Sequence, residues 1–130
     1  MKQVPVSVVI PAYNVAHCVR TCLDSVTGQS ARPHEVIVVD DGSTDATARV
    51  VGEYADKSVR CLVQGNLGPA AARNRGLATA TQAYIAFLDA DDYLHTDFLQ
   101  KTVRFLENHT EAIAVSTGLT IKDLSGEVLH

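Results

Sequence analysis

The sequence is poor in the features that mark secreted and membrane-spanning proteins. It has three cysteines and no tryptophan in 130 residues. An odd, small number of cysteines does not suit the disulfide framework of a secreted domain, so Cys18, Cys22 and Cys61 are interpreted as core thiols in a reducing compartment. No run of eighteen apolar residues occurs, and the first residues lead directly into a strand-like segment. We therefore expect no transmembrane segment and no signal peptide.

Positive charge and two glycine-rich nucleotide motifs are also lacking. The chain has 11 basic and 15 acidic residues, a net charge of −4. Nucleic-acid binders concentrate Lys and Arg on one face, so we expect no nucleic-acid partner. No Gly-x-Gly-x-x-Gly follows a strand and no Gly-Lys-Ser/Thr occurs, which excludes the Rossmann dinucleotide and P-loop interpretations. A small anion is still compatible with the composition if a few positive groups or a cation lie near it.

What the sequence does have is a regular alternation of β-branched runs and segments with helical spacing, in a length that fits one domain over residues 1–130. Strands are predicted at residues 6–10, 36–39, 59–64 and 84–88, with weaker ones at 112–117 and 119–122. Helices are predicted around residues 15–26, 50–54, 70–80 and 99–106. This α/β order implies a mostly parallel sheet with right-handed crossovers and helices on both faces.

An irregular segment follows each of the four main strands. In open α/β sheets, ligands bind beyond the carboxyl ends of the strands, so we expect these segments to meet at one edge. They are Pro11-Ala12-Tyr13-Asn14, Asp40-Asp41-Gly42-Ser43, Asn66-Leu67-Gly68 and Asp89-Ala90-Asp91-Asp92.

The last of these segments is a candidate metal site. With ten aspartates in the chain, about 0.8 Asp-x-Asp matches arise by chance, so only the position of the motif is informative. Asp89 directly ends an apolar strand, and three carboxylates within four residues repel one another unless protons or a cation intervene. Oxygen ligands of this kind suit Mg²⁺ or Mn²⁺. The alternative is a solvated acidic turn in which Asp92 and Asp97 cap helices.

The second segment has two interpretations as well. Neighbouring carboxylates at Asp40 and Asp41 can accept hydrogen bonds from a base imide or a ribose hydroxyl. Ser43, Thr44 or Asp45 can instead serve only to cap the following helix.

The remaining candidates are aromatic, amide and guanidinium groups. Tyr13 can stack on a base, while Asn14 can cap the first helix. Arg73 can meet a phosphate with its guanidinium fork, whereas Arg75 is interpreted as a surface residue.

Taken together and in order, these segments resemble the family-2 glycosyltransferases, over about residues 6–106. Four separate blocks carry the resemblance. They are Val6-Ser7-Val8-Val9-Ile10-Pro11-Ala12-Tyr13-Asn14, Glu35-Val36-Ile37-Val38-Val39-Asp40-Asp41-Gly42-Ser43-Thr44-Asp45, Asn66-Leu67-Gly68-Pro69-Ala70-Ala71-Ala72-Arg73-Asn74-Arg75-Gly76 and Phe87-Leu88-Asp89-Ala90-Asp91-Asp92.

The resemblance implies an A-type glycosyltransferase fold, a nucleotide-diphosphate sugar as donor and inversion at the anomeric carbon. It implies a saccharide or lipid-linked acceptor, Mn²⁺ or Mg²⁺ as cofactor, and a cytoplasmic location, peripheral at the inner face of the membrane, in cell-envelope polysaccharide synthesis. It places residues 11–14 beside the base, Asp41 on the base imide, usually of uracil, and Asp40 in support of that loop. Arg73 would lie near the phosphates, Asp89 at ribose or metal, and Asp91 on the metal.

One departure from the family pattern concerns the general base. Family members continue into a longer second half that carries acceptor-binding elements and an acidic base. Asp123 and Glu127 come too early and in an unlike context, so no catalytic base is identified. The resemblance therefore implies that this chain is the donor-binding part of a longer enzyme, with the base beyond residue 130.

Three alternatives stay open at this point. A signalling receiver domain phosphorylated on aspartate also has an acidic pair, but that pair follows its first strand, whereas a whole strand and helix precede Asp40. A haloacid-dehalogenase-type phosphatase has a similar Asp-x-Asp motif, but near the chain start and followed by Thr or Val, where this chain has Asp92. A non-catalytic nucleotide-sugar-binding module is the third alternative.

Overall fold

The computed structural model describes residues 2–129 and contains a single four-stranded sheet with helices on both faces. Its elements follow the predicted alternation of strand and helix. In chain order they are β1 (Gln3–Ala12), α1 (Val19–Thr27), β2 (Arg32–Asp40), α2 (Thr47–Gly52), the 3₁₀ turn η1 (Ala55–Lys57), β3 (Val59–Val63), α3 (Pro69–Thr79), β4 (Tyr84–Phe87) and α4 (Phe98–Asn108).

All strand pairs in the sheet are parallel, in the order β3-β2-β1-β4. The apolar run 36–39 lies in the inner strand β2, where none of its four side chains is more than 1% exposed. A strand covered on both faces needs apolar residues without alternation, which is why this run is continuous. Parallel pairing also places the carboxyl ends of all four strands at one edge.

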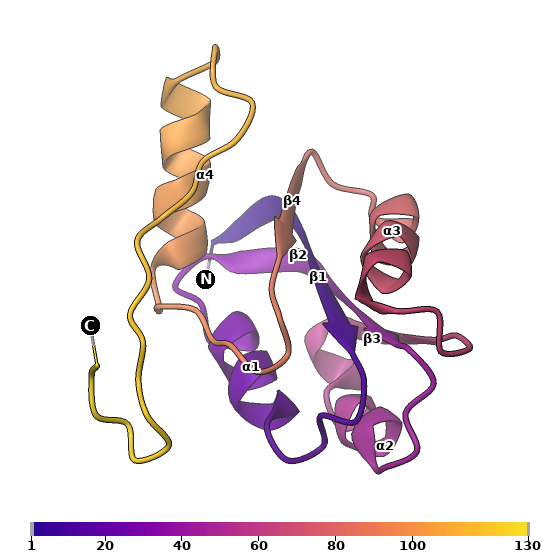
Figure 1. The fold of residues 1–130 in the computed structure, drawn as a ribbon. Coiled ribbons are helices and arrows are strands. Elements are labelled where there is room, and N and C mark those ends of the chain that lie inside the picture. The colour runs from indigo at the N-terminus through magenta and orange to yellow at the C-terminus, as the bar shows by residue number, and fades with distance from the viewer. Residues whose placement is uncertain (1, 130) are drawn as a thin grey trace.

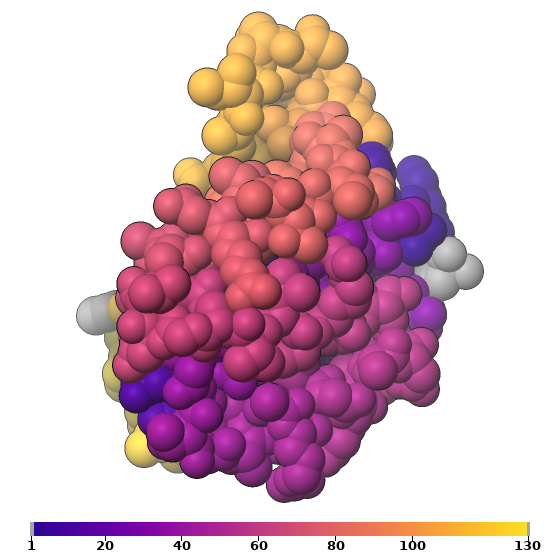
Figure 2. Space-filling model, turned by 90° about the vertical axis from the view of Figure 1, so that its right-hand side faces the viewer, coloured from indigo at the N-terminus to yellow at the C-terminus, as the bar shows by residue number. Residues whose placement is uncertain are grey.

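Helices cover both faces of the sheet, as predicted (Figure 1). Val36 and Val38 point into the larger core cluster, which includes apolar residues of α1, α2 and α4. Ile37 and Val39 point to the other face, where Ala72 of α3 packs on them. Figure 2 shows the α3 side, on which α3 and its flanking loops form the middle of the surface, the purple and magenta region of β2, α2 and β3 lies below them, and α4 and the segment after it project above.

The two weaker strand predictions, at 112–117 and 119–122, are wrong. After α4 the chain turns back and runs beside that helix (Figure 1), with only an isolated antiparallel bridge between Lys122 and Val128. The apolar side chains of this segment find no sheet to join: Ile113 and Leu124 are fully exposed. β-Branched composition alone does not make a strand without a partner.

Within residues 2–129, none of the helices has both the length and the apolar character needed to cross a bilayer.

Candidate functional site

A cavity of about 490 Å³ lies at the carboxyl edge of the sheet and receives residues from all four irregular segments. The predicted convergence of these segments is therefore confirmed. Of the predicted site residues, Asn14 and Asp40 are not in the cavity wall. The wall consists of Pro11, Ala12, Tyr13, Val15, His17, Cys18, Asp41, Asn66, Gly68, Pro69, Ala72, Arg73, Asp89, Ala90 and Asp91.

Side chains of the segment after β2 hold the segment after β1 in place. The backbone N–H of Asn14 donates to Ser43 Oγ at 2.9 Å, and that of Val15 donates to Thr47 Oγ1 at 3.0 Å. In return Asn14 Oδ1 accepts from the N–H of Thr44 at 2.8 Å. Asn14 has a positive φ of 50° and does not cap α1, which begins five residues later, so the capping prediction for Asn14 is wrong.

Asp40 and Asp41 are both buried but have different surroundings. Asp40 Oδ1 accepts the N–H of Ser43 at 3.0 Å, which stabilises the turn at Gly42. Asp45 accepts the N–H of Thr47 at 2.9 Å, but the residue before α2 is Ala46 and no side chain caps the helix, so the capping prediction for residues 43–45 is wrong. Asp40 thus acts on the loop rather than in the cavity.

Asp41 organises the segment after β3 with both of its carboxylate oxygens. Oδ1 accepts from Gln64 Nε2 and from the N–H of Leu67, each at 2.8 Å, while Oδ2 accepts from the N–H of Gly68 at 2.9 Å. The hydrogen bond from Gln64, with those from the backbone, lowers the pKa of the Asp41 carboxyl. Because each carboxylate oxygen can accept two hydrogen bonds, Oδ2 still has one lone pair for a ligand.

Three carboxylates gather at the end of β4. Asp89, Asp91 and Asp92 each offer an oxygen, and these oxygens lie within 4.8 Å of one another. Burial raises the pKa of Asp92, and the charges of Asp91 and Asp89 raise it further. Arg73 compensates part of this charge, because its Nη2 lies 2.7 Å from Asp89 Oδ1.

Asp97 does not supply the predicted cap of α4. It occupies the position before the helix, but its side chain makes no capping hydrogen bond there. Its carboxylate pairs instead with Lys101 one turn along, at 2.6 Å.

Arg75 lies outside the cavity wall and donates to the carbonyl oxygen of Val63 at 2.6 Å.

Several residues of the cavity wall were given no role in the sequence analysis. Asn66 belongs to the irregular segment after β3 that was expected at this edge. His17, Cys18 and Pro69 lie near the irregular segments, and this proximity is their only sequence signal because none of them belongs to a spacing pattern of its own. Cys22 was interpreted as a core thiol and is fully buried, whereas Cys18 is only half-buried.

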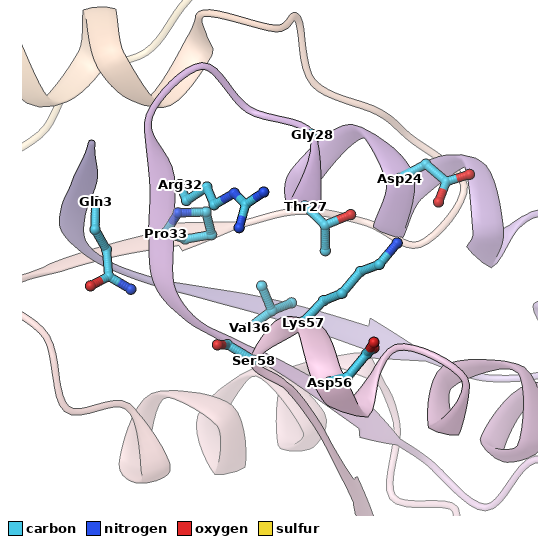
Figure 3. Close-up of a pocket in the computed structure, with 10 residues that line it drawn as sticks. All are labelled: Gln3, Asp24, Thr27, Gly28, Arg32, Pro33, Val36, Asp56, Lys57 and Ser58. Carbon is cyan, nitrogen blue, oxygen red and sulfur yellow. The ribbon is translucent and has the colours of Figure 1, made fainter. Parts of the chain in front are cut away.

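A second hollow of about 380 Å³ lies at the opposite, amino-terminal edge of the sheet (Figure 3). Lys57 of η1 extends across it toward the last turn of α1, and its Nζ lies 5.3 Å from the centre of the Tyr54 ring. Asp24 at its wall already accepts from the Tyr54 hydroxyl at 2.7 Å. This hollow contains none of the predicted site residues.

A parallel α/β sheet with a cavity at its carboxyl edge is an arrangement that many nucleotide-binding proteins share. The glycosyl transferase family 2 model matches residues 7–128, nearly the whole chain. The chain therefore belongs to glycosyl transferase family 2. This assignment removes the receiver-domain and phosphatase alternatives.

Similar proteins include named transferases and solved complexes. The amylovoran biosynthesis glycosyltransferase AmsB of Erwinia amylovora is 43% identical over 112 residues, which cover 82% of this chain and 37% of AmsB. S. aureus TarS in complex with UDP is 32% identical with a TM-score of 0.77, covering 85% of this chain and 33% of TarS. The mannosyltransferase PcManGT from Pyrobaculum calidifontis, in complex with GDP-Man and Mn²⁺, is 32% identical with a TM-score of 0.73, covering 78% of this chain and 32% of PcManGT.

These similarities establish that the fold is the A-type glycosyltransferase fold. The chain spans only part of the length of these relatives, from 17% to 43% in eight similar curated proteins.

Proposed function

We propose that this chain binds the nucleotide-diphosphate sugar, most simply a UDP-sugar, for an inverting glycosyltransferase that acts on a saccharide or lipid-linked acceptor hydroxyl. One observation carries the proposal: the base-side residues Tyr13 and Asp41 share a single cavity with Arg73 and the acidic cluster of Asp89 and Asp91. TarS with UDP and PcManGT with GDP-Man support the same ligand class, since both are similar to this chain over most of its length.

The base would occupy the part of the cavity between the first two segments. Tyr13 is 46% exposed, so one ring face is accessible for stacking. The free lone pair of Asp41 Oδ2 suits the imide N–H of uracil, and the lowered pKa keeps this group an acceptor at neutral pH. Residues 11–14 are held by the segment after β2, so the base site is formed before the ligand arrives.

The donor set at the end of β4 fits a hard divalent cation. Three carboxylate oxygens within 4.8 Å provide oxygen ligands only, the chemistry that Mn²⁺ and Mg²⁺ prefer. Asp91 and Asp89 would hold the ion, with Asp92 as their neighbour. When bound, the ion would offset the repulsion between carboxylates and diphosphate and act as a Lewis acid toward the leaving nucleotide.

Arg73 and the start of α3 would complete the phosphate side. The guanidinium lies beside the acidic cluster, and the cavity wall also contains Pro69, the first residue of α3, and Gly68 directly before it. A helix N-terminus and a guanidinium both favour an anion at this place. A diphosphate could therefore take the guanidinium contacts that Asp89 now holds.

Calorimetric titration of the chain with UDP tests the proposal, once with Mn²⁺ and once with EDTA. We expect binding that weakens markedly in EDTA. The absence of heat and of any thermal shift with UDP and with other nucleoside diphosphates would contradict donor binding. Equal affinities with Mn²⁺ and with EDTA would contradict the metal assignment alone.

A further inference from the structure

The acidic cluster stands on a long loop that has little structure of its own. Between the end of β4 and the start of α4, residues 88–97 are neither helix nor strand. This loop carries Asp89, Asp91 and Asp92, whose mutual repulsion favours its opening. Arg73 pairs with Asp89 only, so other contacts must hold the backbone of the loop.

Besides the backbone hydrogen bonds from Leu88 to Val9 and from Ser30 to Thr96, the contacts to the loop backbone come from one line of side chains that runs from just before α1 to just past its end. Cys18, Cys22, Ser25 and Gln29 are spaced four, three and four residues apart, which places them on one helical face. We call them the polar stripe. Each of them hydrogen-bonds a backbone group in or directly after the acidic loop.

The first half of the polar stripe contacts the loop where the metal ligands stand. Cys22 Sγ donates to the carbonyl oxygen of Asp89 at 3.6 Å, and the single S–H of Cys18 is shared between the carbonyl oxygens of Val15 at 3.6 Å and Ala90 at 3.7 Å. Thiol hydrogen bonds are weak, so these contacts orient the loop carbonyl groups but add little to the stability of the loop. They orient the peptide groups that flank the Asp89 and Asp91 side chains.

The second half of the polar stripe fixes the far end of the loop with stronger bonds. Ser25 Oγ accepts the N–H of Leu94 at 3.0 Å. Gln29 is fully buried, and its Nε2 donates to the carbonyl oxygen of His95 at 2.6 Å while its Oε1 accepts the N–H of Leu99 at 3.0 Å. Leu99 lies in the first turn of α4, where an N–H has no partner within the helix. Gln29 thus accepts a free N–H in the first turn of α4, a capping hydrogen bond that the Asp97 side chain does not make.

We propose that the polar stripe is the positioning element of the acidic cluster and sets its affinity for the divalent cation. None of its contacts reaches a carboxylate, so it acts only through the loop backbone. By holding the backbone, it keeps the carboxylates close together before the cation binds, and binding then does not have to order the loop. This inference rests on the proposed metal site, and its test separates the two.

The test removes one hydroxyl from the polar stripe and one from elsewhere on the fold. Ser25→Ala deletes the acceptor of the Leu94 N–H and, with it, the hydroxyl that donates to the Cys22 carbonyl oxygen at 2.7 Å. Tyr54→Phe is the matched control. It deletes a hydroxyl that donates to Asp24 of α1, and this hydroxyl makes no contact with the loop. Ser25→Thr restores a hydroxyl and should restore the wild-type behaviour. Mn²⁺ affinity is measured from the electron paramagnetic resonance signal of free Mn²⁺, and hydrogen exchange is followed for amides 88–95 without metal.

We expect Ser25→Ala to weaken Mn²⁺ binding by about 10-fold, the scale typical of residues that orient metal ligands, and to speed exchange in amides 88–95. Tyr54→Phe should change neither quantity. Wild-type affinity and wild-type exchange in Ser25→Ala, or equal losses in Ser25→Ala and Tyr54→Phe, would overturn the positioning role while leaving the metal site intact. If the wild-type chain bound no Mn²⁺, the metal site and the positioning role would both be overturned.

Discussion

Arg73 in α3 and Asp89 at the end of β4 form a salt bridge, with 2.7 Å between Nη2 and Oδ1, at the wall of the cavity. The two side chains come from different elements, α3 and the segment after β4, and meet at the cavity. The guanidinium can therefore pair with either the carboxylate or a diphosphate. Removing it should have opposite effects on metal affinity and on nucleotide affinity.

Arg73→Met should lower the affinity for UDP measured in EDTA by about 10-fold or more, which corresponds to the loss of one charge-assisted contact. The same change should leave Mn²⁺ binding unchanged or raise it, because Asp89 is released from its partner. Stability should hardly change, since an exposed ion pair contributes about 0–1 kcal/mol. Separate titrations with each ligand check this. Arg75→Met is the control, and a parallel loss of both ligands in the Arg73 variant would contradict the assignment.

Asp91→Asn should abolish the metal dependence of UDP binding while the chain stays folded. The change removes one negative charge from a cluster of repelling carboxylates, so stability has little to lose. Asp97→Asn is the control, because Asp97 pairs with Lys101 outside the cavity. The measurement is UDP affinity with Mn²⁺ and with EDTA for all three chains. An Asp91→Asn chain as metal-dependent as wild type would show that the cluster is only structural.

Gly76→Ala should destabilise the chain. A Cβ at Gly76 would lie 2.2 Å from Val9 Cγ1, so α3 or the strand β1 must move. Overpacking of this kind typically costs about 1–3 kcal/mol. Gly52→Ala is the matched control, since nothing lies within 4 Å of a Cβ there, and it should be neutral or slightly stabilising. Urea unfolding of both variants decides, and equal midpoints would contradict the close contact.

The stability contributed by Asp41 should disappear in acid. Its folded pKa is lowered by the hydrogen bonds from Gln64, Leu67 and Gly68, so its contribution is present above the unfolded pKa, about 3.9, and is lost as the pH falls through the folded value. Asp41→Asn should thus melt below wild type at pH 7, and the gap should close toward pH 3. Thermal melts across this range test it. A gap independent of pH would show that the charge of Asp41 does not stabilise the segment after β3.

Sugar transfer by this 130-residue chain alone should be slow or absent. No carboxylate outside the acidic cluster and Asp41 lines the cavity, so no further acidic residue in its wall is left to serve as the expected acidic general base. A positioned general base typically contributes about 10²–10⁴-fold to the rate. Transfer is measured with a UDP-sugar beside a longer version of the protein. Equal turnover would show that the base lies within residues 1–130, whereas donor binding without transfer by either version would favour a non-catalytic binding module.

The sequence by itself determined the architecture and the position of the site. The apolar run 36–39 and the helical spacing of apolar residues between the strands are local patterns. Such patterns can be read from the sequence and predict which segments are strands, which are helices and which are buried. The polar segments after each strand follow from the same pattern, because parallel strands bring their carboxyl ends to one edge. The strand predictions at 112–117 and 119–122 failed because composition does not reveal whether a partner strand is present.

Only the tertiary structure decided which groups touch. Asp41 receives its donors from residues more than twenty positions away, and Gln29 reaches Leu99 seventy positions along the chain. Likewise, Asp97 leaves α4 uncapped by its own side chain while Gln29 bonds the helix from outside. A hydrogen bond depends on tenths of an ångström and on the direction of both groups. The packing of separate helices and strands determines these distances and directions, and the spacing of residues along the sequence does not predict them.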